Sequence, residues 1–270
     1  MKRVLGKVAL VTGAARGQGR AEAVKLAEEG ADVIITDICA QPTATDYPSA
    51  TIEDLAETAR LVEKTGQRVV HSVADVRDLA ALENLVRNGV SELGRLDIVV
   101  ANAGIVSWGR FWEMEPQAWQ DMIDINLTGV YNTLRAAAPV MIDAGNGGSI
   151  IATSSVAGIK SLPGQAHYSA AKHGVVGLAK SAAIELAPYR IRVNTVHPWG
   201  VNTPMGQMGA DAQKVFTDNP SFGAAMGQYW FDPPISEPED IANVVLFLAS
   251  DESRTITGSQ ITPDHGATKI

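Results

Sequence analysis

The chain has 270 residues, of which 46% are hydrophobic and 19% charged, and its net charge is −8. This composition is typical of a globular protein with a large core, and the acidic balance disfavours nucleic acid or an anionic membrane as a partner. A single cysteine, Cys39, excludes an intrachain disulfide framework. Because we find neither a secretory signal nor a run of roughly eighteen apolar residues, we expect a soluble, cytoplasmic protein.

A strand, a glycine-rich loop and a helix follow one another near the start of the chain. Val8 to Val11 form a short apolar run, the sequence T-G-A-A-R-G-Q-G follows, and a helical pattern extends from Arg20 to Glu29. In this order Gly13 permits a tight turn, Gly17 lets the backbone approach a pyrophosphate, and Gly19 allows close packing where the helix begins. The predicted dinucleotide-binding loop comprises Gly13, Arg16, Gly17, Gln18 and Gly19.

The second predicted strand, Asp32 to Ile38, carries an acidic residue at its end. A carboxylate at Asp37, roughly 20 residues beyond the loop, can accept hydrogen bonds from the adenosine ribose and would repel a 2′-phosphate. Arg16 points the other way, because its guanidinium could hold that phosphate. We give Asp37 more weight, since its charge would lie against the 2′ position itself, and we expect Asp37 and Ile38 to bind NAD.

A polar, proline-containing segment from Gln41 to Thr51 precedes a helix predicted from about Ile52 to Lys64. This insertion either folds over the adenosine end of the cofactor or forms a solvated surface loop. The sequence favours neither interpretation.

The third predicted strand spans Gln67 to Ala74, and Asp78 caps a helix that continues to about Leu93. The fourth strand, Asp97 to Gly104, is almost entirely apolar, as expected for a strand that is buried on both faces. Small residues at its end leave room for a cofactor. The residues expected to contact the cofactor after these two strands are Asp75, Val76, Asn102, Ala103 and Gly104.

A long helix is predicted from Pro116 to Ala138, with Asn126 inside its apolar pattern. A buried amide is costly unless it is hydrogen-bonded, so we expect Asn126 to bend the helix or to hold a water molecule. The fifth strand, Gly147 to Ser154, and the sixth, Ile191 to His197, flank a helix from about Gln165 to Leu186.

That helix carries Tyr168 and Lys172, which at a spacing of four lie on the same helical face. An ammonium near a phenol favours the phenolate and lowers the pKa of the tyrosine, while Ser155 can hydrogen-bond the oxygen of an alcohol or carbonyl. Taken alone, the tyrosine–lysine pair is typical of an ordinary helix surface. However, other predicted site residues fall at strand ends, where doubly wound folds bind their ligands: Gly13 to Gly19, Asp37, Asp75, Asn102, Ser155 and Pro198.

From Pro204 to Ser236 the pattern loosens and becomes rich in methionine and aromatic residues, which predicts an apolar lid over about 204–236. The lid residues singled out are Met205, Met208, Phe216, Phe222, Met226, Tyr229, Trp230 and Phe231. A helix from Glu237 to Ala249 and a strand from Gly258 to Asp264 complete the chain. Strands and helices alternate throughout, so we predict a single α/β domain over residues 1–270, with a doubly wound parallel sheet.

Together these motifs resemble the short-chain dehydrogenase/reductase family: Thr12-Gly13-x3-Gly17-x-Gly19, Asn102-Ala-Gly104, Asn126, Ser155 and Tyr168-x3-Lys172. The resemblance implies a seven-stranded Rossmann sheet, a homotetramer, Tyr168 as acid/base and Ser155 as the group that orients the substrate oxygen. It further implies that Lys172 binds the nicotinamide ribose and depresses the tyrosine pKa, and that Asn126 holds a water in a proton relay.

The sequence departs from the family pattern after the sixth strand, where Trp199 follows Pro198 in place of the usual glycine. Pro198, Gly200, Val201 and Thr203 can still be assigned to the cofactor by resemblance. Trp199 is expected to narrow or shape the substrate pocket.

Within the family, the loop, the insertion and HPWGVNTPM look like the actinobacterial carveol-dehydrogenase-like group. That group is associated with mycofactocin as an electron acceptor and with tightly held NAD, which would make the insertion a cofactor clamp. We therefore predict NAD-dependent oxidation of an apolar secondary alcohol, such as the cyclic terpenoid carveol.

Two other functions stay open, and two more lack the motif that they require. A different hydrophobic alcohol or ketone, such as a steroid, and a non-catalytic NAD-binding regulator both stay open. A serine hydrolase would need G-x-S-x-G, which is absent, and no paired histidine spacing such as H-E-x-x-H predicts a metal site. By their positions His167 and His197 are expected to line the pocket.

Overall fold

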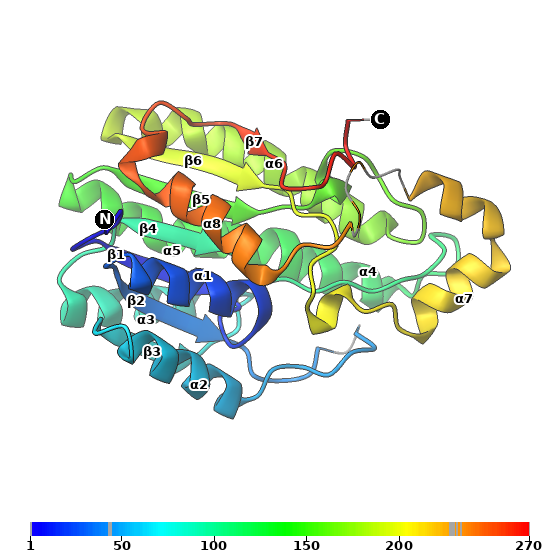
Figure 1. The fold of residues 1–270 in the computed structure, drawn as a ribbon, viewed down its shortest axis with the longest axis horizontal. Helices are drawn as coiled ribbons and strands as arrows, with labels where there is room; N and C mark the ends of the chain where they lie inside the picture. Colours follow the sequence, from blue (N-terminus) through cyan, green and yellow to red (C-terminus); the bar gives the residue numbers. More distant parts are fainter. Residues whose placement is uncertain (1, 43–44, 227–229, 231, 233, 270) are drawn as a thin grey trace.

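The computed structural model describes residues 2–42, 45–226, 230, 232 and 234–269. These residues form a parallel sheet of seven strands in the order β3-β2-β1-β4-β5-β6-β7, which confirms the predicted fold (Figure 1). The strands are β1 (Val8–Thr12), β2 (Asp32–Asp37), β3 (Val69–Val73), β4 (Ile98–Ala101), β5 (Gly148–Thr153), β6 (Ile191–Val196) and β7 (Gln260–Ile261).

Helices cover both faces of the sheet. They are α1 (Gly17–Glu28), α2 (Ile52–Glu63), α3 (Leu79–Leu93), α4 (Pro116–Ile123), α5 (Gly129–Ala144), α6 (Ala166–Leu186), α7 (Ala210–Asp218) and α8 (Pro238–Ala249). Apolar residues of α1, α2 and α8 pack on one face, and those of α3, α5 and α6 pack on the other (Figure 1). Among the described helices, none is long and apolar enough to cross a membrane.

The strands carry apolar side chains on both faces because each face of the sheet is covered. In β1, Val8 and Leu10 belong to the core under α3 and α5, whereas Ala9 and Val11 belong to the core under α1 and α8. Alternate residues of a strand point to opposite faces, so one continuous apolar run supplies two cores. The strand interiors thus supply the two apolar cores, and polar groups that could meet a ligand lie at the strand ends.

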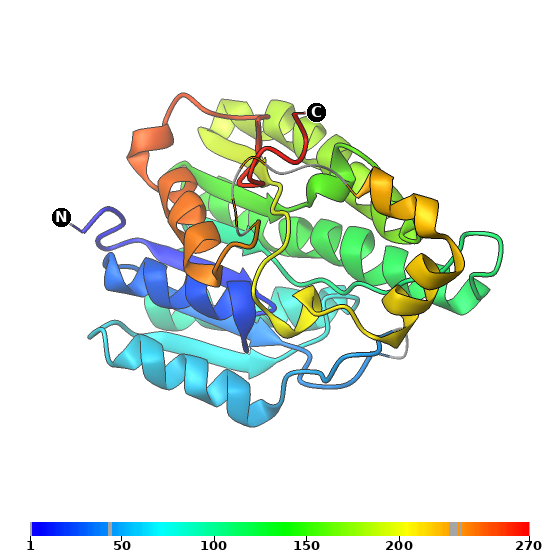
Figure 2. The ribbon, with the colours of Figure 1, turned by 45° about the vertical axis from the view of Figure 1, so that its right-hand side comes forward.

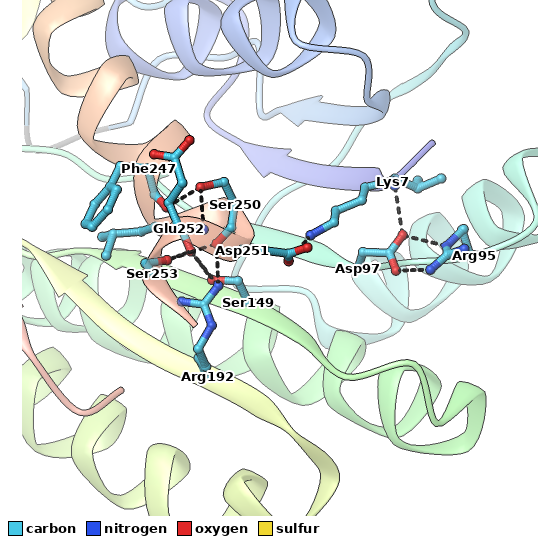
Figure 3. Close-up of polar contacts among 12 residues, drawn as sticks. Lys7, Arg95, Asp97, Ser149, Arg192, Phe247, Ser250, Asp251, Glu252 and Ser253 are labelled. Atoms are coloured by element: carbon cyan, nitrogen blue, oxygen red, sulfur yellow. Dashed lines mark hydrogen bonds and ion pairs between the residues drawn. The ribbon is translucent and has the colours of Figure 1, made fainter. Parts of the chain in front are cut away.

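At the amino ends of the strands a polar network fixes the end of α8 to the sheet (Figure 3). The carbonyl oxygen of Leu248 accepts hydrogen bonds from Ser149 Oγ at 2.7 Å, from the Arg192 guanidinium at 2.8 Å and from Ser253 Oγ at 3.0 Å. Nearby, Asp97 accepts from the Val8 N–H. These polar groups are hydrogen-bonded within the protein, so they are not available to a ligand at this edge of the sheet. The carboxyl edge is the one at which a ligand can bind.

The predicted long helix from Pro116 to Ala138 is interrupted, which corrects the expectation of one continuous element. A π-helical turn, η1 (Asp124–Thr128), separates α4 from α5. The Asn126 side chain leaves the helix and bonds both the N–H and the carbonyl of Ile105. A π-helical turn contains one more residue than an α-helical turn. This extra residue accompanies the hydrogen bonds from the Asn126 side chain to Ile105, outside the helix.

Two further predictions need correction near the end of the chain. The last strand is only Gln260–Ile261, because Pro263 offers no N–H and the Asp264 carboxylate then accepts from Gly266 and Thr268, which turns the chain. Residues 204–236 are not a structureless loop but contain α7 between the short helices η4 (Pro204–Gly206) and η5 (Pro220–Ala225). These elements lie beyond the carboxyl ends of the strands (Figures 1 and 2).

One carboxyl group is buried in the α1 face of the core. Glu22 is fully buried and neither of its carboxylate oxygens has a hydrogen-bond partner among the described residues. Burial raises the pKa of Glu22 from 4.5 to about 8. The folded protein therefore holds a proton here that the unfolded chain releases above pH 4.5.

This burial makes stability depend on pH. From about pH 5 to pH 8 the folded state binds more protons than the unfolded state, so the free energy of unfolding should fall as pH rises. We expect Glu22→Gln to remove a loss on the order of 3 kcal/mol over this range. Urea unfolding at several pH values measures it. Glu28→Gln, on the exposed side of the same helix, is the control, and equal pH slopes in wild type and Glu22→Gln would contradict the expectation.

Candidate active site

A cavity of about 690 Å³ opens at the carboxyl edge of the sheet. Every residue that the sequence assigned to catalysis or to the cofactor lines it, from Gly13 in the glycine loop to Thr203 after β6. The convergence follows from the topology, since all seven strands are parallel and their carboxyl ends meet at one edge.

The glycine loop has the shape of a pyrophosphate cradle. Gly13 has a φ of +67°, and a Cβ at Gly19 would overlap the Gly13 carbonyl oxygen. Arg16, the N-cap residue of α1, makes no side-chain cap, and the first turn contains no acidic residue. The N–H groups and positive end of the helix dipole are thus directed at the cavity, where they suit an anionic phosphate. These residues fit a dinucleotide.

Asp37 ends β2 at the wall of the cavity. Its Oδ2 accepts from the Ala15 N–H at 3.1 Å and its Oδ1 from the Cys39 N–H at 3.2 Å. Each carboxylate oxygen has a second lone pair for a ribose hydroxyl. Asp37 takes part in none of the ion pairs between described residues, and the Arg16 guanidinium donates to the Pro48 carbonyl instead. Arg16 thus bonds the insertion, and Asp37 has no ion-pair partner among the described residues.

The insertion after β2 lies along the cavity and is not a detached surface loop. Its Tyr47 lines the cavity, and the phenol oxygen accepts from the Val106 N–H at 3.2 Å. Burial raises the pKa of Tyr47 to about 12. The carboxylate of Asp46 lies against Gly209, directly before α7. The described part of the insertion therefore contacts the glycine loop, the β4 end and the start of α7.

Lys172 lines the cavity but is almost fully buried, with 3% of the residue exposed. Its Nζ donates to the Thr153 carbonyl at 2.8 Å and lies 5.6 Å from the centroid of the Tyr168 ring. Burial lowers the pKa of Lys172 to about 8, which leaves most of the amine charged at neutral pH.

Burial raises the pKa of Tyr168, and hydrogen bonding with Ser155 lowers it. Burial is the larger effect, so the phenol is not as acidic as the sequence argument from Lys172 alone suggested. Ser155 Oγ also accepts from the Ala157 N–H at 3.1 Å, which fixes the side chain at the cavity wall.

His167 and His197 do not line the cavity, and this corrects their predicted position. His197 is fully buried; its Nδ1 lies 2.7 Å from the Ser155 carbonyl and its Nε2 2.8 Å from Thr195 Oγ1. His167 Nε2 lies 2.8 Å from Ser107 Oγ. Burial lowers the pKa of each to about 4, so both are neutral, and His197 holds the turn that carries Ser155.

Aromatic and methionine side chains form the outer part of the cavity. Trp108 and Phe216 meet edge to face with 5.6 Å between ring centroids, and Trp199 and Met226 pack against the cluster that contains Val156 and Leu162. Met205 and Met208 also line the cavity, whereas Phe222 lies outside it and Trp230 is 63% exposed. Tyr229 and Phe231 lie outside the described residues. The wall is apolar, as the composition of residues 204–236 predicted.

Comparison with known proteins gives consistent matches over the whole chain. A family model described as enoyl-(acyl carrier protein) reductase matches residues 13–268. A protein of Mycobacterium tuberculosis named as an NAD-dependent oxidoreductase is 50% identical over 266 residues, which cover 98% of this chain and 96% of that one. The (−)-trans-carveol dehydrogenase of Rhodococcus erythropolis is 49% identical over 276 residues, with 99% of both chains covered.

A solved structure agrees with these sequence matches. The short-chain dehydrogenase of Mycobacterium paratuberculosis bound to NAD superposes with a TM-score of 0.97 at 47% identity, covering 99% of this chain and 100% of that one. The chain belongs to the short-chain dehydrogenase/reductase family. The oxidoreductase family inferred from the motifs is therefore confirmed.

Sequence reasoning missed several residues of this dehydrogenase's cavity, including Tyr47, Trp108, Thr153 and Gln165. Thr153 could have been found, because it ends a strand directly before Ser155. Gln165 could have been noticed three residues before Tyr168, whereas Tyr47 lies in a segment without a motif and only the three-dimensional structure brings it to the cavity.

The pKa of Tyr168 can be measured directly. We expect Ser155→Ala to raise it further, because the hydrogen bond that favours the phenolate is lost. Titration of the ring carbon signals in ¹³C-tyrosine-labelled protein, assigned with Tyr168→Phe, gives the value. Ser154→Ala is the control, since its Oγ bonds the Lys172 carbonyl. An equal rise in both variants would refute the role of Ser155.

Proposed function

We propose that this protein is an NAD-dependent dehydrogenase that oxidises an apolar secondary alcohol to a ketone. The observation that supports this most directly is the meeting of Ser155, Tyr168 and Lys172 at one wall of a cavity whose other end is the glycine loop. The family membership and the name of the Mycobacterium tuberculosis relative support NAD. The uncompensated charge of Asp37 favours NAD over its 2′-phosphorylated form.

In this proposal Tyr168 takes the proton of the substrate hydroxyl, while Ser155 hydrogen-bonds the same oxygen and orients it. The bound nicotinamide supplies the hydride acceptor. The Lys172 ammonium, close to the phenol, favours its ionised form and would bind the nicotinamide ribose. The site thus separates proton transfer, performed by the protein, from hydride transfer.

Asn126 completes the proposed relay through its oxygen atoms. Its amide N–H groups are already used by the carbonyls of Ile105 and Met122, and its Oδ1 accepts from the Ile105 N–H. Only the second lone pair of Oδ1 and the backbone carbonyl are left to hold a water. That water would connect the buried Lys172 with solvent.

The substrate that fits best is a cyclic terpenoid alcohol such as carveol. The aromatic and methionine wall offers apolar surface, and the only Lys and Arg among the described lining residues are Lys172 and Arg16, which are engaged elsewhere. A carboxylate substrate would lack a partner there. The 49% identity with a carveol dehydrogenase supports the same class.

Oxidation of carveol tests this function. Purified protein with NAD should reduce the cofactor when carveol is added, and Tyr168→Phe should lower kcat by about 100-fold or more while binding of NAD is kept. NADH absorbance gives the rate, and calorimetry with NAD gives the binding. Undiminished turnover in Tyr168→Phe would show that Tyr168 is not the acid/base.

We also propose that the insertion clamps the cofactor and that residues 204–236 act as a lid. Tyr47 and Pro48 connect the insertion to the β4 end and to Arg16, so NAD could leave only after these bonds open. By resemblance to the carveol-dehydrogenase-like group, the reduced cofactor would pass its electrons to an external acceptor such as mycofactocin. One turnover per site, continuing only with an artificial acceptor, would support this arrangement.

The hydrogen bond from the Val106 N–H to the Tyr47 phenol oxygen holds the insertion in the proposed clamp, and a substitution can remove it. We expect Tyr47→Phe to speed cofactor release roughly fivefold, because the Val106 N–H loses its partner. Protein loaded with NADH is mixed with excess NAD, and the fall in bound NADH fluorescence gives the rate. Tyr189→Phe, at an exposed position on the far helix end, should leave release unchanged. Identical rates in all three proteins would exclude the clamp.

The family resemblance further supports a homotetramer. Exposed apolar side chains lie on the helices after β4 and β5: Trp119 is 43% exposed on α4, Tyr131 46% on α5 and Ile184 77% on α6. Light scattering of the native protein gives the mass that decides the oligomeric state.

A further inference from the structure

The side chain of Gln165 is a polar group that neither the fold nor the proposed proton transfer uses. It lines the cavity, 4% exposed, at the N-cap position of α6, one turn before Tyr168. Its Oε1 is buried and has no hydrogen-bond partner among the described residues. Buried amides are almost always bonded in native proteins, so this one is suited to a ligand.

The surroundings of Gln165 identify the side of the cavity that it serves. The preceding residue, Gly164, accepts from the Gly109 N–H, and a Cβ at Gly164 would lie 3.3 Å from the Trp108 ring. The Gln165 N–H donates to the Leu162 carbonyl, and Leu162 packs in the cluster that includes Trp199 and Tyr168. These are residues of the apolar wall, whereas the glycine loop and Asp37 lie at the other end of the cavity.

An amide in this position selects among substrates. The buried atom without a partner is Oε1, which only accepts, so a hydroxyl, which can donate, suits it best; a carbonyl could bond only Nε2. A purely hydrocarbon group placed against it would leave it unpaired, and sites with an unpaired buried polar group discriminate strongly against such analogues. The group most suited to this position is an uncharged oxygen.

We propose that Gln165 binds a second oxygen of the substrate. The preferred substrate is then an apolar cyclic alcohol or ketone that carries, besides the reacting hydroxyl, another hydroxyl or carbonyl on the side facing α6. This inference rests on the proposed function and narrows it. Carveol, with a single oxygen, would be turned over but would leave Gln165 without a partner.

The test compares 1,4-cyclohexanediol with 4-methylcyclohexanol, which replaces the second hydroxyl by a methyl group of similar size. We expect wild type to prefer the diol about tenfold in kcat/KM, and Gln165→Leu to abolish or reverse this preference. Gln165→Met, closer in shape, serves as a second variant if Gln165→Leu does not fold. Gln67→Leu, just before the amino end of β3 and outside the cavity, is the control and should keep the wild-type ratio.

Binding is measured beside turnover, so that the two proposals can fail separately. Quenching of tryptophan fluorescence in NAD-loaded protein reports occupancy, because Trp108 and Trp199 line the cavity. Preferential binding of the diol that is lost in the Gln165 variants supports the inference even if neither alcohol is oxidised, in which case the dehydrogenase proposal falls alone. Equal binding of both alcohols in wild type, or the same preference in the Gln165 variants, overturns the inference.

Discussion

The buried ammonium of Lys172 is the constraint around which the site is assembled. A cation at this depth is costly unless it is hydrogen-bonded, and its Nζ donates to the carbonyl of Thr153, the last residue of β5. The ends of β4 and β5, the π-helical turn and α6 all meet here. A Cβ at Gly104 would lie 2.6 Å from Asn126 Oδ1 and 3.5 Å from Lys172 Nζ, so only glycine permits this approach. The ammonium thus joins α6 to the end of β5, and the close approach at Gly104 places the β4 end and the π-helical turn beside it.

The same arrangement fixes where a substrate oxygen can be held. Ser154 Oγ donates to the Lys172 carbonyl, which joins the turn after β5 to α6. From the other side, His197 donates from Nδ1 to the Ser155 carbonyl, and the Val156 N–H bonds the Pro198 carbonyl. The turn with Ser155 is therefore held between β6 and α6. Bonds to the backbone of Ser155, Val156 and Lys172 therefore help to position Ser155 relative to Tyr168.

The parts of the molecule that could be predicted are those specified by local sequence. Strand ends follow from apolar runs, and the position of Asp37 at the cavity wall follows from its place at the end of β2. Family resemblance favours Ser155 over Ser154, because the family spaces its serine thirteen residues before the tyrosine. Both serines line the cavity, but Ser154 Oγ donates to the Lys172 carbonyl, whereas Ser155 hydrogen-bonds Tyr168.

The parts that could not be predicted depend on partners far away in the sequence. The π-helical turn exists because Asn126 bonds Ile105, twenty-one residues before it, and helical periodicity carries no trace of that bond. His197 has the sequence position of a pocket residue, but it turns to Ser155 and Thr195 and is buried. Tyr47 reaches the cavity through the Val106 N–H, fifty-nine residues away. In each case a long-range hydrogen bond decides the orientation of the side chain.

The two segments that extend beyond the strand ends act on one cavity from opposite sides. The insertion brings Tyr47 to the β4 end, and Asp46 lies against Gly209 at the start of α7, so the wall near the cofactor contacts the wall near the substrate. A carboxylate before a helix N-terminus is favourable, and moving either segment would give up that contact. In the proposed arrangement of clamp and lid, moving one segment would therefore loosen the other. Retention of the cofactor and closure over the substrate would then be coupled through the contact of Asp46 with Gly209.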